Sequence, residues 1–352
     1  MKFFSKKIIG LSFLAFISQG LFAKGSNALA LGSVLPERVA RANVVTSFVK
    51  IDSKFDAQGN KISLPLGLTT NLGITAAALE YGLTSKISLQ VLIPFVYSNE
   101  MSFEPSELIE SEGFSLFASK SPINDRAQNA ALFLNSLEQA KHGKTGLADI
   151  EAGARYNWIT NDSLIFSTGL GVRIPTGNNN AHKLLRPIGS GFYTGAIRNN
   201  LDFSLLEKSL WFSLEHQAEI ALSKARKNSE NPDNPLDLVL DPSKQTSSYQ
   251  SGLTHKAKAQ TSFSFKALTD HLKFLSTSVS YNFTSEADLY VEGKKSEERS
   301  YLHAVNGNIS LSALPYKIPV SLDLDYTKPF AGLNSRGDKE SLTLKLKAYM
   351  KI

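Results

Sequence analysis

Residues 149–158, DIEAGARYNW, alternate between two kinds of side chain. The polar set is Asp149, Glu151, Arg155 and Asn157, and apolar or small residues lie between its members. Successive side chains of a β-strand point to opposite faces, so a period of two predicts a strand with one wet face and one apolar face. Segment 87–97 repeats the pattern, with apolar residues at every second position.

The same alternation recurs along the whole chain. Most of the segments run to about ten to thirteen residues, longer than usual strands and long enough to cross a bilayer when tilted. The predicted strands are 42–54, 71–82, 86–98, 147–159, 162–174, 194–206, 209–222, 251–267, 271–285, 300–312, 317–328 and 340–352.

The connections between these strands alternate in length. Short turns are predicted at 83–85, 160–161, 207–208, 268–270 and 313–316, and long polar segments at 55–70, 99–146, 175–193, 223–250, 286–299 and 329–339. Short periplasmic turns and long extracellular loops are typical of membrane barrels, whereas a soluble sandwich has no reason to alternate. The prediction is an all-β fold, a transmembrane antiparallel up-and-down β-barrel of about 12 strands, with both termini periplasmic.

The first residues have the layout of a secretory signal peptide. Lys2, Lys6 and Lys7 precede an apolar core over 8–17, and Ala23 offers a small residue for cleavage. An N-terminal membrane anchor is the alternative interpretation, and Ala28 or Ala30 are alternative cleavage sites. The predicted division is 1–23 signal peptide, 24–40 periplasmic N-terminal segment and 41–352 barrel, exported to the bacterial outer membrane.

Charge and cysteine content limit the partners and the source of stability. Removing 1–23 removes three lysines and no acid, so the net charge falls from +6 to +3, and no basic run supports nucleic-acid binding. The chain has no cysteine, so stability comes from burial or from a closed hydrogen-bond network. Expected partners are outer-membrane lipid, a small-molecule solute and the outer-membrane assembly machinery. That machinery commonly reads a final Phe or Trp, where this chain ends on Ile352.

Two segments could occupy the pore. Within 99–146, the stretch from Ser121 to Ala140 has apolar residues at helical spacing after plausible capping residues, which predicts a short helix that folds inward or caps the outside. Segment 24–40 either enters the periplasmic mouth or remains a disordered tail. Aromatic residues near the strand ends predict interfacial girdles: Tyr81, Tyr97, Tyr156, Trp158, Trp211, Tyr281, Tyr301 and Tyr326.

Three stretches resemble the outer-membrane family named after the meta-pathway of phenol degradation, whose members are assigned as transporters. They are EYGLT at 80–84 leading to Pro94 and Phe95, GLADIEAGARY at 146–156, and GLGVRIPTG at 169–177. The likeness covers roughly residues 70–220 and rests on glycine-rich strand motifs. It implies a channel or porin-like transporter for small molecules, hydrophobic or aromatic ones among them, and it supplies no catalytic residues.

Charged residues at the expected inner positions are the candidate selectivity lining. They would set up a transverse field in the pore, or simply solvate it and pair across strands. The candidates are Glu80, Asp149, Glu151, Arg155, Arg173, Arg198, Asp202, Glu215, Glu219, Lys256, Lys258, Asp323, Asp325, Lys345 and Lys347. Glycines at 153, 169 and 171 share the inner face, where a missing side chain relieves crowding or permits a bend.

An outer-membrane hydrolase is the main rival class, because some twelve-stranded barrels are lipases or proteases. His303 with Ser310 or Ser312 is the nearest candidate pair, and no family signature surrounds it. No histidines show metal spacing and no dinucleotide loop is present, so no enzyme activity, cofactor or metal is predicted. A structural or adhesive barrel without transport is the remaining alternative.

Overall fold

The computed structural model describes residues 30–64, 67–102, 142–177, 188–206, 208–223, 225–228, 246–286, 289–291, 294–297, 299–335 and 339–352. The predicted signal peptide at 1–23 and the predicted helix within 99–146 lie outside these residues.

Twelve long strands form the wall of the molecule, and each coincides with one of the predicted segments. Their bounds are β1 Val39–Ile51, β4 Thr69–Gly82, β5 Ile87–Ser102, β7 Ile150–Thr160, β8 Leu164–Ile174, β9 Thr194–Leu205, β10 Leu210–Ala221, β13 Thr254–Ser264, β14 Leu275–Glu286, β17 Ser300–Ser312, β18 Val320–Leu333 and β19 Glu340–Lys351.

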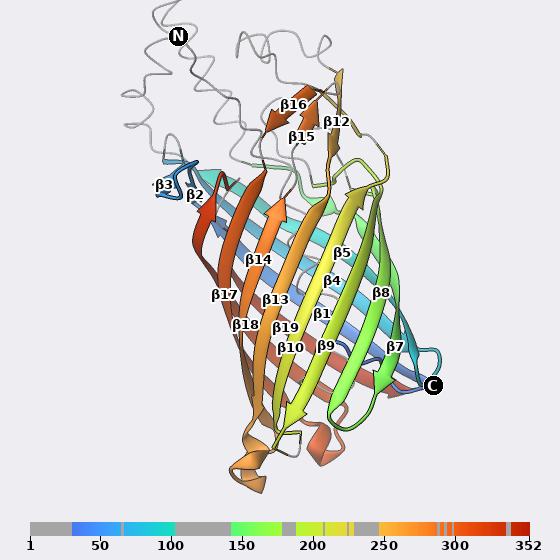
Figure 1. Cartoon of the computed structure of the whole chain (residues 1–352). Coiled ribbons are helices and arrows are strands. Elements are labelled where there is room, and N and C mark those ends of the chain that lie inside the picture. Colours follow the sequence, from blue (N-terminus) through green and yellow to red (C-terminus); the bar gives the residue numbers. More distant parts are fainter. Residues whose placement is uncertain are drawn as a thin grey trace, which may run out of the picture.

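The sheet is closed and antiparallel throughout. β1 lies between β4 and β19, with Val45 opposite Ala76 on one side and Lys345 on the other. Every other wall strand pairs with its neighbours in sequence, and the short β6 (Gly146–Leu147) extends the pairing of β5 beyond β7. Closure satisfies the backbone groups of both edges, which is what a strand structure needs in a bilayer. Figure 1 shows the strongly tilted strands of this barrel.

The two ends of the barrel differ, and we call them the turn end and the loop end. The turn end carries the connections 83–86, 161–163, 206–209, 265–274 and 313–319, and the C-terminus lies there, where the Ile352 amide donates to the Arg38 carbonyl at 2.8 Å. The loop end carries a hairpin of β2 (Ser53–Phe55) and β3 (Lys61–Ser63). It also carries a four-stranded sheet, at the top of Figure 1, of β11 (Ala225–Asn228), β12 (Thr246–Ser251), β15 (Leu289–Val291) and β16 (Lys294–Glu297).

One predicted long segment is shorter than expected. Residues 329–333 continue β18, so the connection to β19 covers only 334–339. Pro329 lies opposite Ala304, beside a register shift that leaves Phe330 as an extra residue in β18. A bulge of this kind tolerates proline within a strand, which is why a residue that usually ends a strand does not end this one.

The two faces of the wall have opposite character. Large apolar side chains such as Leu89, Val91 and Ile93 of β5 are exposed on the outside. Polar and charged side chains are buried on the inside, as expected from the alternation. No helix in the described part of the chain is long and apolar enough to cross a membrane.

Candidate functional site

All of the predicted lining residues lie on the inner face of the barrel. Most are buried, and four are half-buried: Glu215, Lys258, Asp325 and Lys345. Their distribution divides them into a group on β7 to β13 and a second group on β4, β18 and β19. Whether they select solutes stays a prediction.

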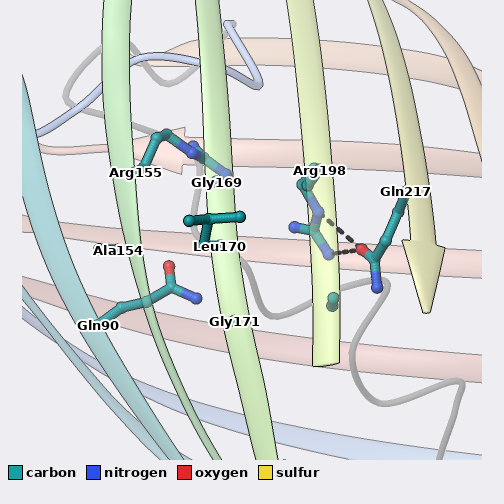
Figure 2. Close-up of a pocket in the computed structure, with 9 residues that line it drawn as sticks. Gln90, Ala154, Arg155, Gly169, Leu170, Gly171, Arg198 and Gln217 are labelled. Atoms are coloured by element: carbon teal, nitrogen blue, oxygen red, sulfur yellow. Dashed lines mark hydrogen bonds between the residues drawn. The ribbon is translucent and has the colours of Figure 1, made fainter. Parts of the chain in front are cut away.

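On the first group of strands, Arg198 is held by an amide and a carboxylate. Its Nε donates to Gln217 Oε1 at 2.7 Å (Figure 2) and lies 3.6 Å from Glu215 Oε1. Asn200 Nδ2 donates to Glu215 Oε2 at 2.9 Å. These contacts fix the plane of the guanidinium group against the wall.

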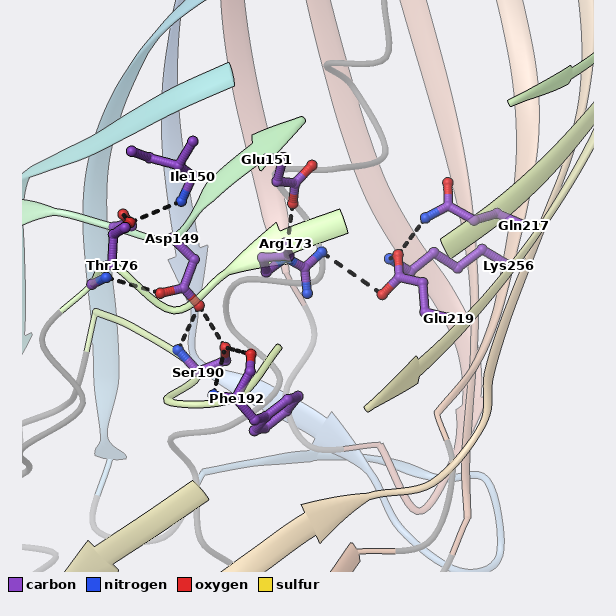
Figure 3. A network of polar contacts seen from close by, with 12 residues as sticks. Asp149, Ile150, Glu151, Arg173, Thr176, Ser190, Phe192, Gln217, Glu219 and Lys256 are labelled. Atoms are coloured by element: carbon purple, nitrogen blue, oxygen red, sulfur yellow. Dashed lines mark hydrogen bonds and ion pairs between the residues drawn. The ribbon is translucent and has the colours of Figure 1, made fainter. Parts of the chain in front are cut away.

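A second set of charges lies nearer the loop end (Figure 3). Arg173 Nε donates to Glu151 Oε1 at 2.8 Å, and its Nη2 lies 3.7 Å from Glu219 Oε2. Lys256 Nζ lies 2.5 Å from Glu219 Oε1, which also accepts from Gln217. These charges therefore pair across β7, β8, β10 and β13.

The opposite wall carries separate ion pairs. Arg41 contacts Glu80 in a pair that is 0% and 2% exposed. A second pair joins Lys347 to Asp323, which also accepts from Ser310 Oγ at 2.6 Å. Lys345 Nζ lies 2.9 Å from Asp325 Oδ2 in a third pair. Because each cation of these three pairs has an anion beside it, this wall presents both signs of charge to the lumen.

An apolar strip lies on β1, β4 and β5, nearer the loop end than the Arg41–Glu80 pair. Val45 of β1, Ala76 of β4 and Leu92 of β5 are buried together. Closer to the loop end, Leu72, Ile74 and Val96 form a second cluster. The inner wall therefore carries an apolar strip between charged surfaces on β7 to β13 and on β18 and β19.

Residues 30–35 lie inside the barrel at the turn end, and all six are buried. The amides of Leu31 and Gly32 donate to the Asp202 carboxylate at 3.1 and 2.7 Å. Arg155 Nη1 donates to the Leu31 carbonyl at 2.8 Å. Ala30 packs on Trp211, which is 1% exposed and points inward. The assignment of Trp211 to an interfacial girdle is therefore wrong. Its ring is buried against Ala30, and its N–H donates to the carbonyl of Lys208.

Asp149 holds a second chain segment at the loop end. Its carboxylate accepts from the Gly177 amide at 3.0 Å, and from the amide and hydroxyl of Ser190 at 2.7 and 2.5 Å (Figure 3). Ile188 of the same segment packs on the apolar strip beside Leu72. Asp149 thus anchors a loop inside the mouth, while its neighbour on the same face, Glu151, joins the ion-pair network.

Sequence reasoning missed several polar residues of this lumen. Arg41 lies one residue before the predicted start of its strand, which leaves it outside the predicted lining. Gln217 and Asn200 have inward parity, which is the available signal, but the predicted lining contains charged residues alone. Gly32 lies in a segment without periodicity.

The candidate hydrolase pair does not form. His303 lies on the outer face, where its Nδ1 is 2.6 Å from the Tyr281 hydroxyl. Ser310 lies on the inner face and donates to Asp323. Among the described residues, no group of three or more His, Cys, Asp or Glu side chains could hold a metal ion.

A closed antiparallel barrel of twelve strands, apolar outside and polar inside, defines a transmembrane β-barrel of the outer-membrane type.

No protein-family model matches the chain, and no curated protein matches it. The solved structure of the COG4313 outer membrane channel from Pseudomonas putida F1 is similar, with a TM-score of 0.64 and 16% identity over 93% of this chain and 99% of that chain. The KdgM porin has a TM-score of 0.39 and 7% identity over 87% and 98% of the two chains. The CymD monoaromatic hydrocarbon channel has a TM-score of 0.37 and 6% identity over 90% and 89%. The first of these likenesses supports the fold.

Proposed function

We propose that this protein is an outer-membrane channel for small molecules, hydrophobic or aromatic ones among them, of the phenol meta-pathway type. In this proposal residues 1–23 direct export, the turn end and both termini face the periplasm, and the loop end faces outward. The observation that carries it is the mixed lining of the lumen, in which an apolar strip on β1, β4 and β5 adjoins the charged wall of β7 to β13. A solute with an apolar body and a polar group meets a favourable surface for each part.

The segment at 30–35 bears on the same proposal. It occupies the lumen, and Asp202 and Arg155 hold it through polar contacts. In the proposed channel, displacement of 30–35 opens the path.

Uptake by intact cells tests the proposal. Cells that lack the gene would receive the wild-type protein, an empty vector or the Gly32→Ala variant, and uptake of a panel of labelled aromatic and fatty acids and neutral aromatics would be measured. We expect faster uptake of at least one solute with the wild type, and a further increase with Gly32→Ala. Equal uptake in all three strains for every solute would contradict transport and favour a structural or adhesive barrel.

A further inference from the structure

A small pocket that opens to the lumen lies in the inner wall across β7, β8, β9 and β10 (Figure 2). Its polar lining comes from Arg155 and Arg198, which are 6% and 4% exposed, and from two glutamines, Gln90 and Gln217. Two guanidinium groups and no carboxylate line the pocket, although the wall as a whole has mixed sign.

The register of the strands explains how the pocket arises. Arg155 of β7 lies opposite Gly169 of β8, which lies opposite Arg198 of β9. The two arginines are therefore two strand spacings apart, roughly 10 Å between their backbones. The adjacent inner row consists of glycines and an alanine across the same strands, with Gly171 paired to Ala196. The floor between the arginines is bare backbone.

Packing does not require the glycine at position 169. A Cβ built there would meet its nearest atoms at 3.6 Å (Ala154 carbonyl) and 3.9 Å (Arg198), ordinary contact distances. Gly82 differs, since a Cβ there would lie 2.0 Å from the Pro36 carbonyl oxygen. Crowding therefore does not account for Gly169, and its effect is to leave open space between two cations.

Both arginines are held in place by other groups. Arg198 is positioned by Gln217 and by Glu215 at 3.6 Å, and Arg155 donates to the Leu31 carbonyl. A guanidinium that is already ordered loses less conformational entropy when it binds an anion, and its forked N–H groups match a carboxylate.

We propose that this pocket binds the carboxylate group of a small organic acid, with the carbon skeleton of the acid resting on the glycine floor of β8. The assignment deepens the proposed channel function and rests on it for its biological use, although binding itself can be measured without transport. A floor made of the carbon atoms of Gly169, Gly171 and Ala196 between the cations favours an organic acid over inorganic phosphate, which exposes charge on every side.

Ligand-detected saturation-transfer NMR on the folded full-length chain in detergent tests the assignment. Benzoate and its neutral isostere benzamide would be titrated against the wild type, Arg198→Gln and Gly169→Val. Matched controls are Lys50→Gln, which removes a cation outside the lumen, and Gly307→Val, at an outward glycine whose added Cβ has no atom within 4 Å. Circular dichroism and heat-shifted gel mobility would verify that each barrel is folded.

We expect benzoate to bind at least about tenfold more tightly than benzamide. Arg198→Gln and Gly169→Val would each weaken benzoate about tenfold or more, and the two controls would leave it unchanged within about twofold. Gly169→Val keeps both arginines, so it decides the matter if Arg198→Gln does not fold. Equal binding of benzoate and benzamide would overturn the proposal, as would wild-type benzoate affinity in Gly169→Val or displacement of benzoate by an equal concentration of phosphate. Uptake of neutral solutes without benzoate binding would refute this site alone, and benzoate binding without any uptake would refute the channel alone.

Discussion

Replacing Asp202 by alanine should release residues 30–35 from the lumen. Burial of Leu31, Val34 and Leu35 contributes about 6 kcal/mol, at about 2 kcal/mol for each side chain. Ordering the backbone of the segment costs about 6 kcal/mol, at about 1 kcal/mol for each residue. These two contributions offset one another, so polar contacts decide whether the segment stays docked, and the two hydrogen bonds to the Asp202 carboxylate are among them. At about 1.5 kcal/mol each they are worth about 3 kcal/mol, which corresponds to roughly a hundredfold in the ratio of docked to undocked chains.

Thiol labelling and single-channel recording measure this change. The chain has no cysteine, so Ser33→Cys introduces a single probe within the buried segment. We expect a charged thiol reagent to label Ser33→Cys slowly in the otherwise wild-type protein and at least about tenfold faster together with Asp202→Ala. Conductance in planar bilayers should rise in Asp202→Ala, because the lumen loses its occupant. The control is Asp162→Ala, which removes an exposed carboxylate at the turn end.

A second variant reaches the same state without changing a charge. A Cβ on Gly32 would lie 2.7 Å from the Asp202 carboxylate and 2.8 Å from Asn200 and Ser167. Gly32→Ala should therefore also speed labelling and raise conductance. If both variants label and conduct like the wild type, the Asp202 contacts do not hold the segment in the lumen and the reasoning fails.

Three further predictions concern the anchors of the barrel. Asp149→Ala removes the acceptor of three hydrogen bonds, so hydrogen exchange of the amides over 188–192 should become at least about tenfold faster. Mass spectrometry measures this exchange, and the barrel strands should keep their protection. Unchanged exchange would show that other contacts hold the loop. Glu80→Gln leaves the buried Arg41 charge without its carboxylate and should lower the free energy of unfolding in urea by about 3 kcal/mol. The double variant Arg41→Met, Glu80→Leu should restore most of this loss. A double variant as unstable as the single one would argue against the pair. Gly82→Ala should lower the melting temperature because its Cβ would overlap the Pro36 carbonyl, whereas Gly307→Ala should leave the melting temperature unchanged. Equal effects of the two substitutions in differential scanning calorimetry would contradict the packing at Gly82.

The period of two predicted the wall because it reports which face of the sheet each side chain occupies. Trp211 shows how that signal can be misread. Its place near a strand end predicts a girdle residue, although the apolar outward positions of its strand, such as Phe212 and Leu214, give it inward parity. A buried tryptophan needs an apolar contact and an acceptor for its N–H, and the contact comes from Ala30, in a segment far away in the sequence.

The alternation of inward and outward positions does not show that Asp149 and Glu151 have different partners. Both lie on the inner face of one stretch of chain, but β7 begins only at Ile150, and the Ile150 amide donates to the Thr176 hydroxyl. The backbone departs from regular pairing there, which brings Asp149 to the loop segment rather than to Arg173. Irregular pairing depends on partners distant in sequence, so a local pattern does not contain it.

The segment at 30–35 contacts one anion and one cation of the charged wall. Asp202 accepts from the amides of the segment and Arg155 donates to one of its carbonyls, so one anion and one cation of the predicted lining are engaged by the same backbone. Displacing the segment exposes both charges together, and the net charge of the passage stays the same. In the proposed channel, a docked backbone segment would therefore set the width of the passage, and the ion pairs of the wall would set its sign preference. This separation gives the pocket at Arg155 and Arg198 its significance, because a local pair of cations can recognise a carboxylate in a lumen whose overall charge is balanced.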